Sequence, residues 1–219
     1  MTPKKPERQS GSHRLRLHIR ESLLRRIIDG KLEAGEALNE SRLATQLKVS
    51  RTPLREALLQ LEREGFVRSD QRRGFSVEPL SARDVREIYP IMWTLEGLAV
   101  RSSWVCIHLL APELARINSE FARSRDAQQA IAIDSRWHEV LTSQSNNHRL
   151  HAIISGLRLS IRRYESLYMG NTQLIPESVA RHNAIIRAIR QNDVEGALRS
   201  LQDNWRFTLE VLIRKMGEE

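Results

Sequence analysis

Three side chains that commonly bind metals lie on helical stripes of apolar residues. Asp134 and His138 are four residues apart on the stripe of Ile131 and Leu141, and His182 lies on a later isoleucine stripe. A buried polar group needs a partner, and one carboxylate with two imidazoles from separate helices could bind a divalent metal. The alternative is that each makes an ordinary internal hydrogen bond. The residues alone leave both interpretations open.

Two arginines, Arg51 and Arg55, project from the start of a short predicted helix. Its apolar residues recur with helical spacing and must face a core: Leu54, Ala57, Leu58 and Leu61. Arg51, Thr52 and Arg55 are left on the opposite face, and Ser50 is the predicted N-cap, with a side chain that accepts from the first turn. In helix-turn-helix proteins this end of the helix enters the major groove, where arginine can bind guanine O6 and N7.

The segments that flank this helix complete a known DNA-binding layout. Before it, Leu43 and Ala44 form the apolar face of a short helix that breaks at residues 48–49. After it, residues 66–77 alternate with a period of two around a polar tip that contains Arg72 and Arg73. The order of a short helix, a capped helix and a basic hairpin predicts a winged helix-turn-helix.

The chain divides into segments of different composition, and the expected fold class is mainly α. Residues 1–12 are polar and basic, and we expect a disordered arm. Residues 13–78 form the winged helix-turn-helix with its α/β wing. From residue 79 onward the apolar period is helical throughout, which predicts an all-α bundle of about six helices to residue 219.

Composition narrows the class of partner. The net charge of +8 and the isoelectric point of about 10.3 favour a polyanion, although the same surplus also serves solubility. The sequence has neither an apolar run of about 18 residues nor a signal-peptide pattern, so we expect a cytoplasmic protein without membrane contact. The single cysteine, Cys106, is expected to be a small buried apolar residue.

The first third of the chain resembles the GntR family of bacterial regulators. The matching motifs are Ile28-Asp29-Gly30, Ala34-Gly35, Leu43-Ala44, Val49-Ser50-Arg51-Thr52-Pro53, Arg55-Glu56-Ala57-Leu58, Glu64-Gly65 and Arg73-Gly74. The resemblance implies that Arg51 and Arg55 contact bases and phosphates, that Thr52 contacts a phosphate, and that Gly74 of the wing approaches the minor groove. The remaining DNA-binding candidates are Arg42, Ser50, Arg72 and Arg73.

The second part is similar to the FCD type of effector-binding and dimerisation domain, found in the FadR branch of that family. The resemblance implies a metal held by Asp134, His138 and His182, with a fourth position at Asn204, where the family has histidine. An amide oxygen binds zinc- or nickel-like ions more weakly than imidazole does. Loose binding, a water network and an absent metal therefore all stay open.

A second departure concerns the effector. Such domains commonly carry an arginine a few residues before a Leu-Glu pair, here Leu95-Glu96, and this chain has Met92 in place of that arginine. A pocket without that guanidinium lacks a bidentate carboxylate clamp. The effector is then either less acidic than the organic or sugar acids typical of the family, or another arginine supplies the charge. The candidates for that role are Arg101, Arg158, Arg162 and Arg163.

The sequence therefore predicts a DNA-binding transcriptional regulator, a repressor rather than an enzyme, that responds to a small metabolite. Because one recognition helix reads few bases, a homodimer on a pseudo-palindromic double-stranded operator is expected. One alternative is a dimeric architectural DNA-binding module without an effector. Another is a metal-dependent hydrolase, for which no nucleophile or general-base motif is present.

Overall fold

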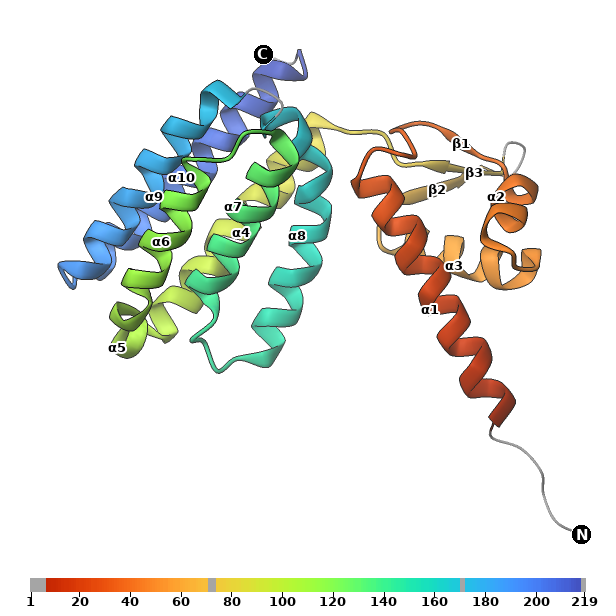
Figure 1. Cartoon of the computed structure of the whole chain (residues 1–219), viewed down its shortest axis with the longest axis horizontal. Helices are drawn as coiled ribbons and strands as arrows, with labels where there is room; N and C mark the ends of the chain where they lie inside the picture. Colours follow the sequence, from red (N-terminus) through yellow and green to blue (C-terminus); the bar gives the residue numbers. More distant parts are fainter. Residues whose placement is uncertain (1–6, 71–73, 170–171, 218–219) are drawn as a thin grey trace, which may run out of the picture. The chain divides into compact units, whose positions relative to one another are not determined.

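The computed structural model describes residues 7–70, 74–169 and 172–217, which form two compact units (Figure 1). The first unit ends at Leu80 and the second begins at Ser81, whereas the sequence places the boundary between residues 78 and 79. Among the described residues, no helix combines the length and the apolar character needed to cross a membrane.

The first unit consists of three helices and a small antiparallel sheet. Its elements are α1 (Glu7–Ile28), β1 (Ala37–Leu38), α2 (Glu40–Leu47), α3 (Arg51–Arg63), β2 (Val67–Asp70) and β3 (Gly74–Val77). Helix α1 packs against α3, and β3 lies between β1 and β2. The strand register pairs Leu38 with Phe75 and Val67 with Val77. This arrangement is a winged helix-turn-helix.

Helix α3 has the predicted core face and the predicted N-cap residue, but not the predicted capping hydrogen bond. Its four apolar stripe residues are buried. Ser50 is the N-cap residue, yet its side chain makes no capping hydrogen bond, so that prediction was wrong. The capping bond would run from the backbone N–H of the second or third helical residue. Pro53 is the third residue and has no N–H to donate. In the preceding turn, Lys48 adopts the left-handed conformation, with φ of 54°.

Helix α1 begins earlier than the sequence predicts. It starts at Glu7, so residues 7–12 of the expected disordered arm are helical, and residues 1–6 lie outside the described residues. The buried face of α1 consists of Ile19, Leu23, Leu24 and Ile27. Leu17 lies before this face and is exposed.

The second unit is helical throughout its described residues. Its elements are α4 (Ala82–Ser102), α5 (Trp104–Ile107), η1 (His108–Leu110), α6 (Ala111–Phe121), α7 (Ala127–Thr142), α8 (His148–Met169), η2 (Thr172–Leu174), α9 (Ile175–Arg190) and α10 (Val194–Lys215). Among the longer helices, α4 packs against α8 and α10, α9 against α10 and α6, and α7 against α6 and α8. These six helices form a closed ring around one interior, and the predicted fold class is confirmed.

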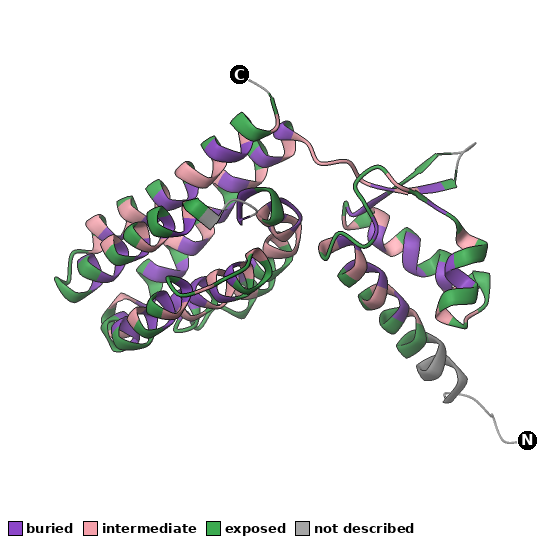
Figure 2. Ribbon diagram, turned by 45° about the horizontal axis from the view of Figure 1, so that its top comes forward, coloured by how far each residue is buried: buried purple, intermediate pink, exposed green. Residues whose placement is uncertain are grey.

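Side chains inside this ring come from all six helices. Figure 2 shows the buried residues gathered on the inner sides of the helices. Asp126 caps α7 by accepting from the backbone N–H of Gln129 at 2.8 Å, and Ser81 caps α4 by accepting from the N–H of Asp84. Most of the interior is apolar, but it also holds buried polar residues: Glu96, Asn118, His138, Ser178, His182 and Asn204.

Candidate DNA-binding groove and candidate metal centre

The predicted DNA-contacting residues of α3 and the wing lie around one groove. Arg51, Thr52, Arg55 and Gly74 line this groove of about 590 Å³, together with residues of β1 and α2. Neither arginine forms an ion pair with a described residue. Arg51 donates from Nη2 to the Ser41 hydroxyl at 2.7 Å, so its guanidinium is oriented and keeps other donors free.

The remaining DNA-binding candidates lie elsewhere or outside the described residues. Arg42 is exposed and pairs with Glu36 at 3.2 Å, and it does not line the groove. Ser50 is exposed next to Arg51. Arg72 and Arg73 lie outside the described residues. Gly74, the first residue of β3, has φ of 74°, a conformation that glycine adopts without strain.

Asp134, His138 and His182 come together inside the bundle. One ligand atom from each lies within 4.8 Å of the other two. His182 Nε2 is 3.5 Å from Asp134 Oδ1, and both histidines are buried. Helix α7 supplies the first two residues, one turn apart, and α9 supplies the third. The spacing noted in the sequence therefore does bring these side chains together.

A buried carboxylate, Glu96 of α4, fixes the tautomer of His138. The two groups are 2.9 Å apart at His138 Nδ1, and Glu96 also accepts from Trp205 Nε1 at 2.8 Å and Arg158 Nη2 at 2.5 Å. Because the carboxylate accepts, the neutral form of His138 carries its hydrogen on Nδ1 and has its lone pair on Nε2. Metal-binding histidines are usually held by a second hydrogen bond of this kind. The sequence interpretation used Glu96 only as a landmark and missed this role.

An amide fixes the tautomer of His182 in the same way. Asn118 of α6 donates from Nδ2 to the Val179 carbonyl at 3.0 Å and to Asn183 at 2.9 Å. Its oxygen faces His182 Nδ1 at 3.1 Å and can only accept, so His182 donates from Nδ1. Its Nε2 is buried and has no hydrogen-bond partner among the described residues. The Trp137 ring stacks on the imidazole, with centroids 3.7 Å apart, and holds its plane.

Electrostatics favour a neutral imidazole at His182 and a charged carboxylate at Glu96. Burial and the neighbouring His138 hold the pKa of His182 well below its usual value, so the imidazole is neutral at pH 7. Burial by itself would raise the pKa of Glu96, but His138 and Arg158 hold that pKa below its usual value. Burial raises the pKa of Asp134, although His138 and Arg158 oppose the shift.

A small cavity adjoins the cluster and includes the fourth predicted position. It has a volume of about 20 Å³ and is lined by Asp134, His138 and Asn204, among other residues. That volume suffices for about one water molecule. Asn204 of α10 is buried, so the amide does face the same interior as the three other candidates.

The predicted effector residues are not gathered at this cavity. Met92 is fully buried but does not line it. Arg101 pairs with Glu195 at 2.8 Å, and both side chains are more than half exposed. Arg101 lies five residues after Glu96, about 140° around α4, and therefore points away from the interior. Arg162 is half-buried on α8 and is not among the lining residues. Arg158, which is paired with Glu96, attracts Asp134 of the cluster electrostatically.

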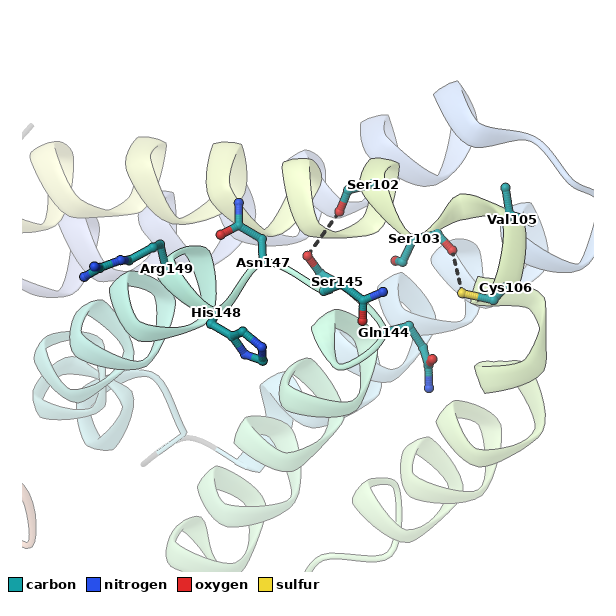
Figure 3. Close-up of a pocket in the computed structure, with 10 residues that line it drawn as sticks. Ser102, Ser103, Val105, Cys106, Gln144, Ser145, Asn147, His148 and Arg149 are labelled. Atoms are coloured by element: carbon teal, nitrogen blue, oxygen red, sulfur yellow. Dashed lines mark hydrogen bonds between the residues drawn. The ribbon is translucent and has the colours of Figure 1, made fainter.

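A larger groove of about 670 Å³ lies at the α4–α5 turn and the α7–α8 loop (Figure 3). It contains none of the metal-ligand candidates. Ser102 donates to the Ser145 hydroxyl at 3.1 Å, and the Cys106 thiol donates to the Ser103 carbonyl at 3.3 Å. Cys106 is half-buried here rather than fully buried as predicted, because α5 is short and lies at the surface.

Comparison with known proteins agrees with this geometry. A winged helix-turn-helix joined to a helical domain with a polar interior site defines a DNA-binding regulator with a separate sensing domain. Residues 15–77 match the bacterial regulatory proteins of the gntR family, and residues 87–206 match the FCD domain. The chain belongs to the GntR family and is a transcriptional regulator, not an enzyme. The family assignment does not favour the hydrolase or the architectural alternative.

Individual relatives cover most of the chain. It is 30% identical to the uncharacterized HTH-type transcriptional regulator YdhC of Bacillus subtilis, over 83% of each chain. It is 29% identical to the gluconate operon transcriptional repressor of Bacillus licheniformis, over 82% of this chain and 77% of the relative. The solved structure of E. coli McbR/YncC shares the fold, with a TM-score of 0.74 and 24% identity over 93% of this chain and 99% of that one.

Proposed function

We propose that this regulator is a homodimeric repressor that binds a pseudo-palindromic operator through α3 and the wing. The groove lined by Arg51, Thr52 and Arg55 carries this proposal, because it presents two guanidinium groups at the N-terminal end of α3 that form no ion pair with a described residue. Two copies double the number of bases read, which one short helix needs for useful specificity. Since its target is bacterial DNA, the protein acts in the cytoplasm.

The bundle of this regulator holds a divalent metal, bound by Asp134, His138 and His182 with Asn204 as a weak fourth contributor. The donor set fits such an ion, because one ligand atom from each of the three residues lies within 4.8 Å of the other two and the buried Nε2 of His182 lacks a partner among the described residues. A bound cation would supply a Lewis acid that attracts oxygen atoms of an effector. Zinc- or nickel-like ions suit the imidazoles.

The effector is a small metabolite that the metal positions in the bundle. The relatives include a gluconate operon repressor and a galactonate operon repressor, which points to an organic or sugar acid. Met92 provides no guanidinium to bind an acidic effector, and the guanidinium of Arg158 is already paired with Glu96. A carboxylate on the effector would therefore depend on the metal for its counter-charge.

Two measurements test this function. Footprinting on DNA that carries inverted repeats should protect two symmetric half-sites, and a monomer that protects one half-site at all concentrations would contradict the dimer. Metal analysis of untagged protein, followed by titration after chelation, should give one ion for each chain. No stoichiometric metal, and no change in melting temperature with zinc, nickel or manganese, would leave the cluster as a hydrogen-bond network.

A further inference from the structure

The cavity beside the metal centre is lined by a second carboxyl group, Glu165 of α8. This residue lies on the same space of about 20 Å³ as Asp134, His138 and Asn204. A space of that size accommodates one small occupant. Glu165 therefore faces the same small space as two of the proposed metal ligands, Asp134 and His138. None of the sequence motifs pointed to Glu165.

Glu165 lacks the partner that a buried carboxyl group normally has. The residue as a whole is partly exposed, but its Oε2 atom is buried and has no hydrogen-bond partner among the described residues. Arg162 and Arg158 attract it electrostatically, yet neither forms an ion pair with it among those residues. Burial, with Asp134 nearby, raises the pKa of Glu165 to about 8. An unpaired buried carboxylate is costly, and a cation is one remedy.

Two other buried polar atoms near this cavity lack a hydrogen-bond partner among the described residues. One is the hydroxyl of Tyr89, a residue that lines the cavity, and the other is His182 Nε2, which lies 3.5 Å from Asp134 Oδ1. Asp134 and Glu165 contribute two negative charges when both are ionised, whereas the charge of Glu96 is balanced by Arg158 at 2.5 Å. A divalent cation would neutralise the two remaining carboxylates.

We propose that Glu165 is the fourth protein donor of the metal centre, in place of the histidine that Asn204 replaces. The inference rests on the proposed metal site and adds the donor that sets its selectivity. Two imidazoles with two carboxylates are a harder donor set than three imidazoles with one carboxylate. Carboxylate ligands suit manganese, and imidazoles suit zinc. This site therefore prefers Zn²⁺ over Mn²⁺ less strongly than a site with the third histidine would.

The test uses the full chain, untagged and freed of metal by chelation. Mn²⁺ binding is followed by electron paramagnetic resonance and Zn²⁺ binding by competition with a chromophoric chelator. Glu165→Gln keeps the side-chain shape and removes the charge. It should weaken Mn²⁺ binding about 10- to 100-fold and Zn²⁺ binding less, the range seen when groups that support a metal site are removed. Glu139→Gln, an exposed carboxylate on α7, is the matched control and should change neither affinity.

The outcomes separate this inference from the metal site itself. If His138→Ala abolishes binding while Glu165→Gln leaves both affinities unchanged, Glu165 is not a donor and the metal site stands. If Glu165→Gln weakens both ions equally and lowers the melting temperature of the metal-free protein, its role is structural and the proposal falls. If the wild-type chain binds neither ion, the metal site fails and this inference fails with it.

Discussion

The arginines of α3 and the histidines of the bundle satisfy their hydrogen-bonding needs in opposite ways. Arg51 and Arg55 stand in an open groove, and water can satisfy their donors until a polyanion replaces it. His138 and His182 are buried, and each is held at Nδ1 by an acceptor from another helix. The first site tolerates change at little cost in stability, whereas each polar group of the second depends on its neighbours.

This contrast separates what substitutions should do. In the groove, removing a side chain should change affinity for DNA and leave folding intact. In the bundle, the same truncation should alter ligand binding and stability together, because a partner is left unpaired. The predictions below run from the largest expected effect to the smallest.

His138→Ala should abolish stoichiometric metal binding and also destabilise the protein. The substitution removes a ligand nitrogen and leaves Glu96 with Trp205 and Arg158 as its remaining partners. Losing one partner of a buried charged group costs about 1 to 3 kcal/mol. Metal titration and chemical denaturation of the same sample measure both effects. His108→Ala, at an exposed histidine, is the control, and an equal effect there would remove the special role of His138.

Arg51→Ala and Arg55→Ala should each weaken operator binding by about 1 to 3 kcal/mol, since each removes one charged contact to a base or a phosphate. Denaturation midpoints should stay at the wild-type value, because both side chains lie opposite the buried face of α3. Binding is measured by gel shift at two salt concentrations. Arg63→Ala, at the exposed far end of α3, should bind as wild type. Unchanged affinity with either test variant would exclude that arginine from the interface.

Asn204→His should tighten zinc binding by about tenfold, because imidazole replaces a poor ligand at a position that already lines the cavity. Manganese affinity should change less. Calorimetric titration of the metal-free protein with each ion measures the two affinities. An unchanged zinc affinity in a folded variant would mean that position 204 does not reach the metal.

Two glycine-to-alanine substitutions, one in each unit, should change stability by about 1 kcal/mol or less in opposite directions. Gly65 ends α3 with φ of 76°, where Phe66 N–H reaches the Leu61 carbonyl at 2.9 Å, so Gly65→Ala should destabilise. Gly156 lies inside α8 with open space around it, so Gly156→Ala should stabilise. Denaturant unfolding measures the change in the free energy of unfolding for each variant. Changes of the same sign would contradict the conformations assigned to these two glycines.

The spacing of apolar residues and the positions of turn and helix-breaking residues in the sequence determined the helices and strands and their buried faces. The stripe of α3 predicted its buried residues, and the period-two segments around the wing predicted β2 and β3. These patterns are local, because helix and strand periods are properties of neighbouring residues. The spacing of Asp134 and His138 likewise placed two candidates on one turn of one helix. Ser50 makes no side-chain cap, and one of the two positions that could donate to it is a proline without an N–H.

Only the tertiary structure decided which partners those residues meet. Glu96 lies 42 residues from His138 and Asn118 lies 64 from His182, so no local pattern links them. Glu165 reads in the sequence as an ordinary charged residue of a helix, and the ring of six helices turns it toward the cavity. Arg101 has the charge of an effector ligand, but the rotation of α4 carries it outward to Glu195. Residue type and spacing set the chemistry that is available, and helix packing selects the groups that share one interior, because burial makes an unpaired polar atom costly.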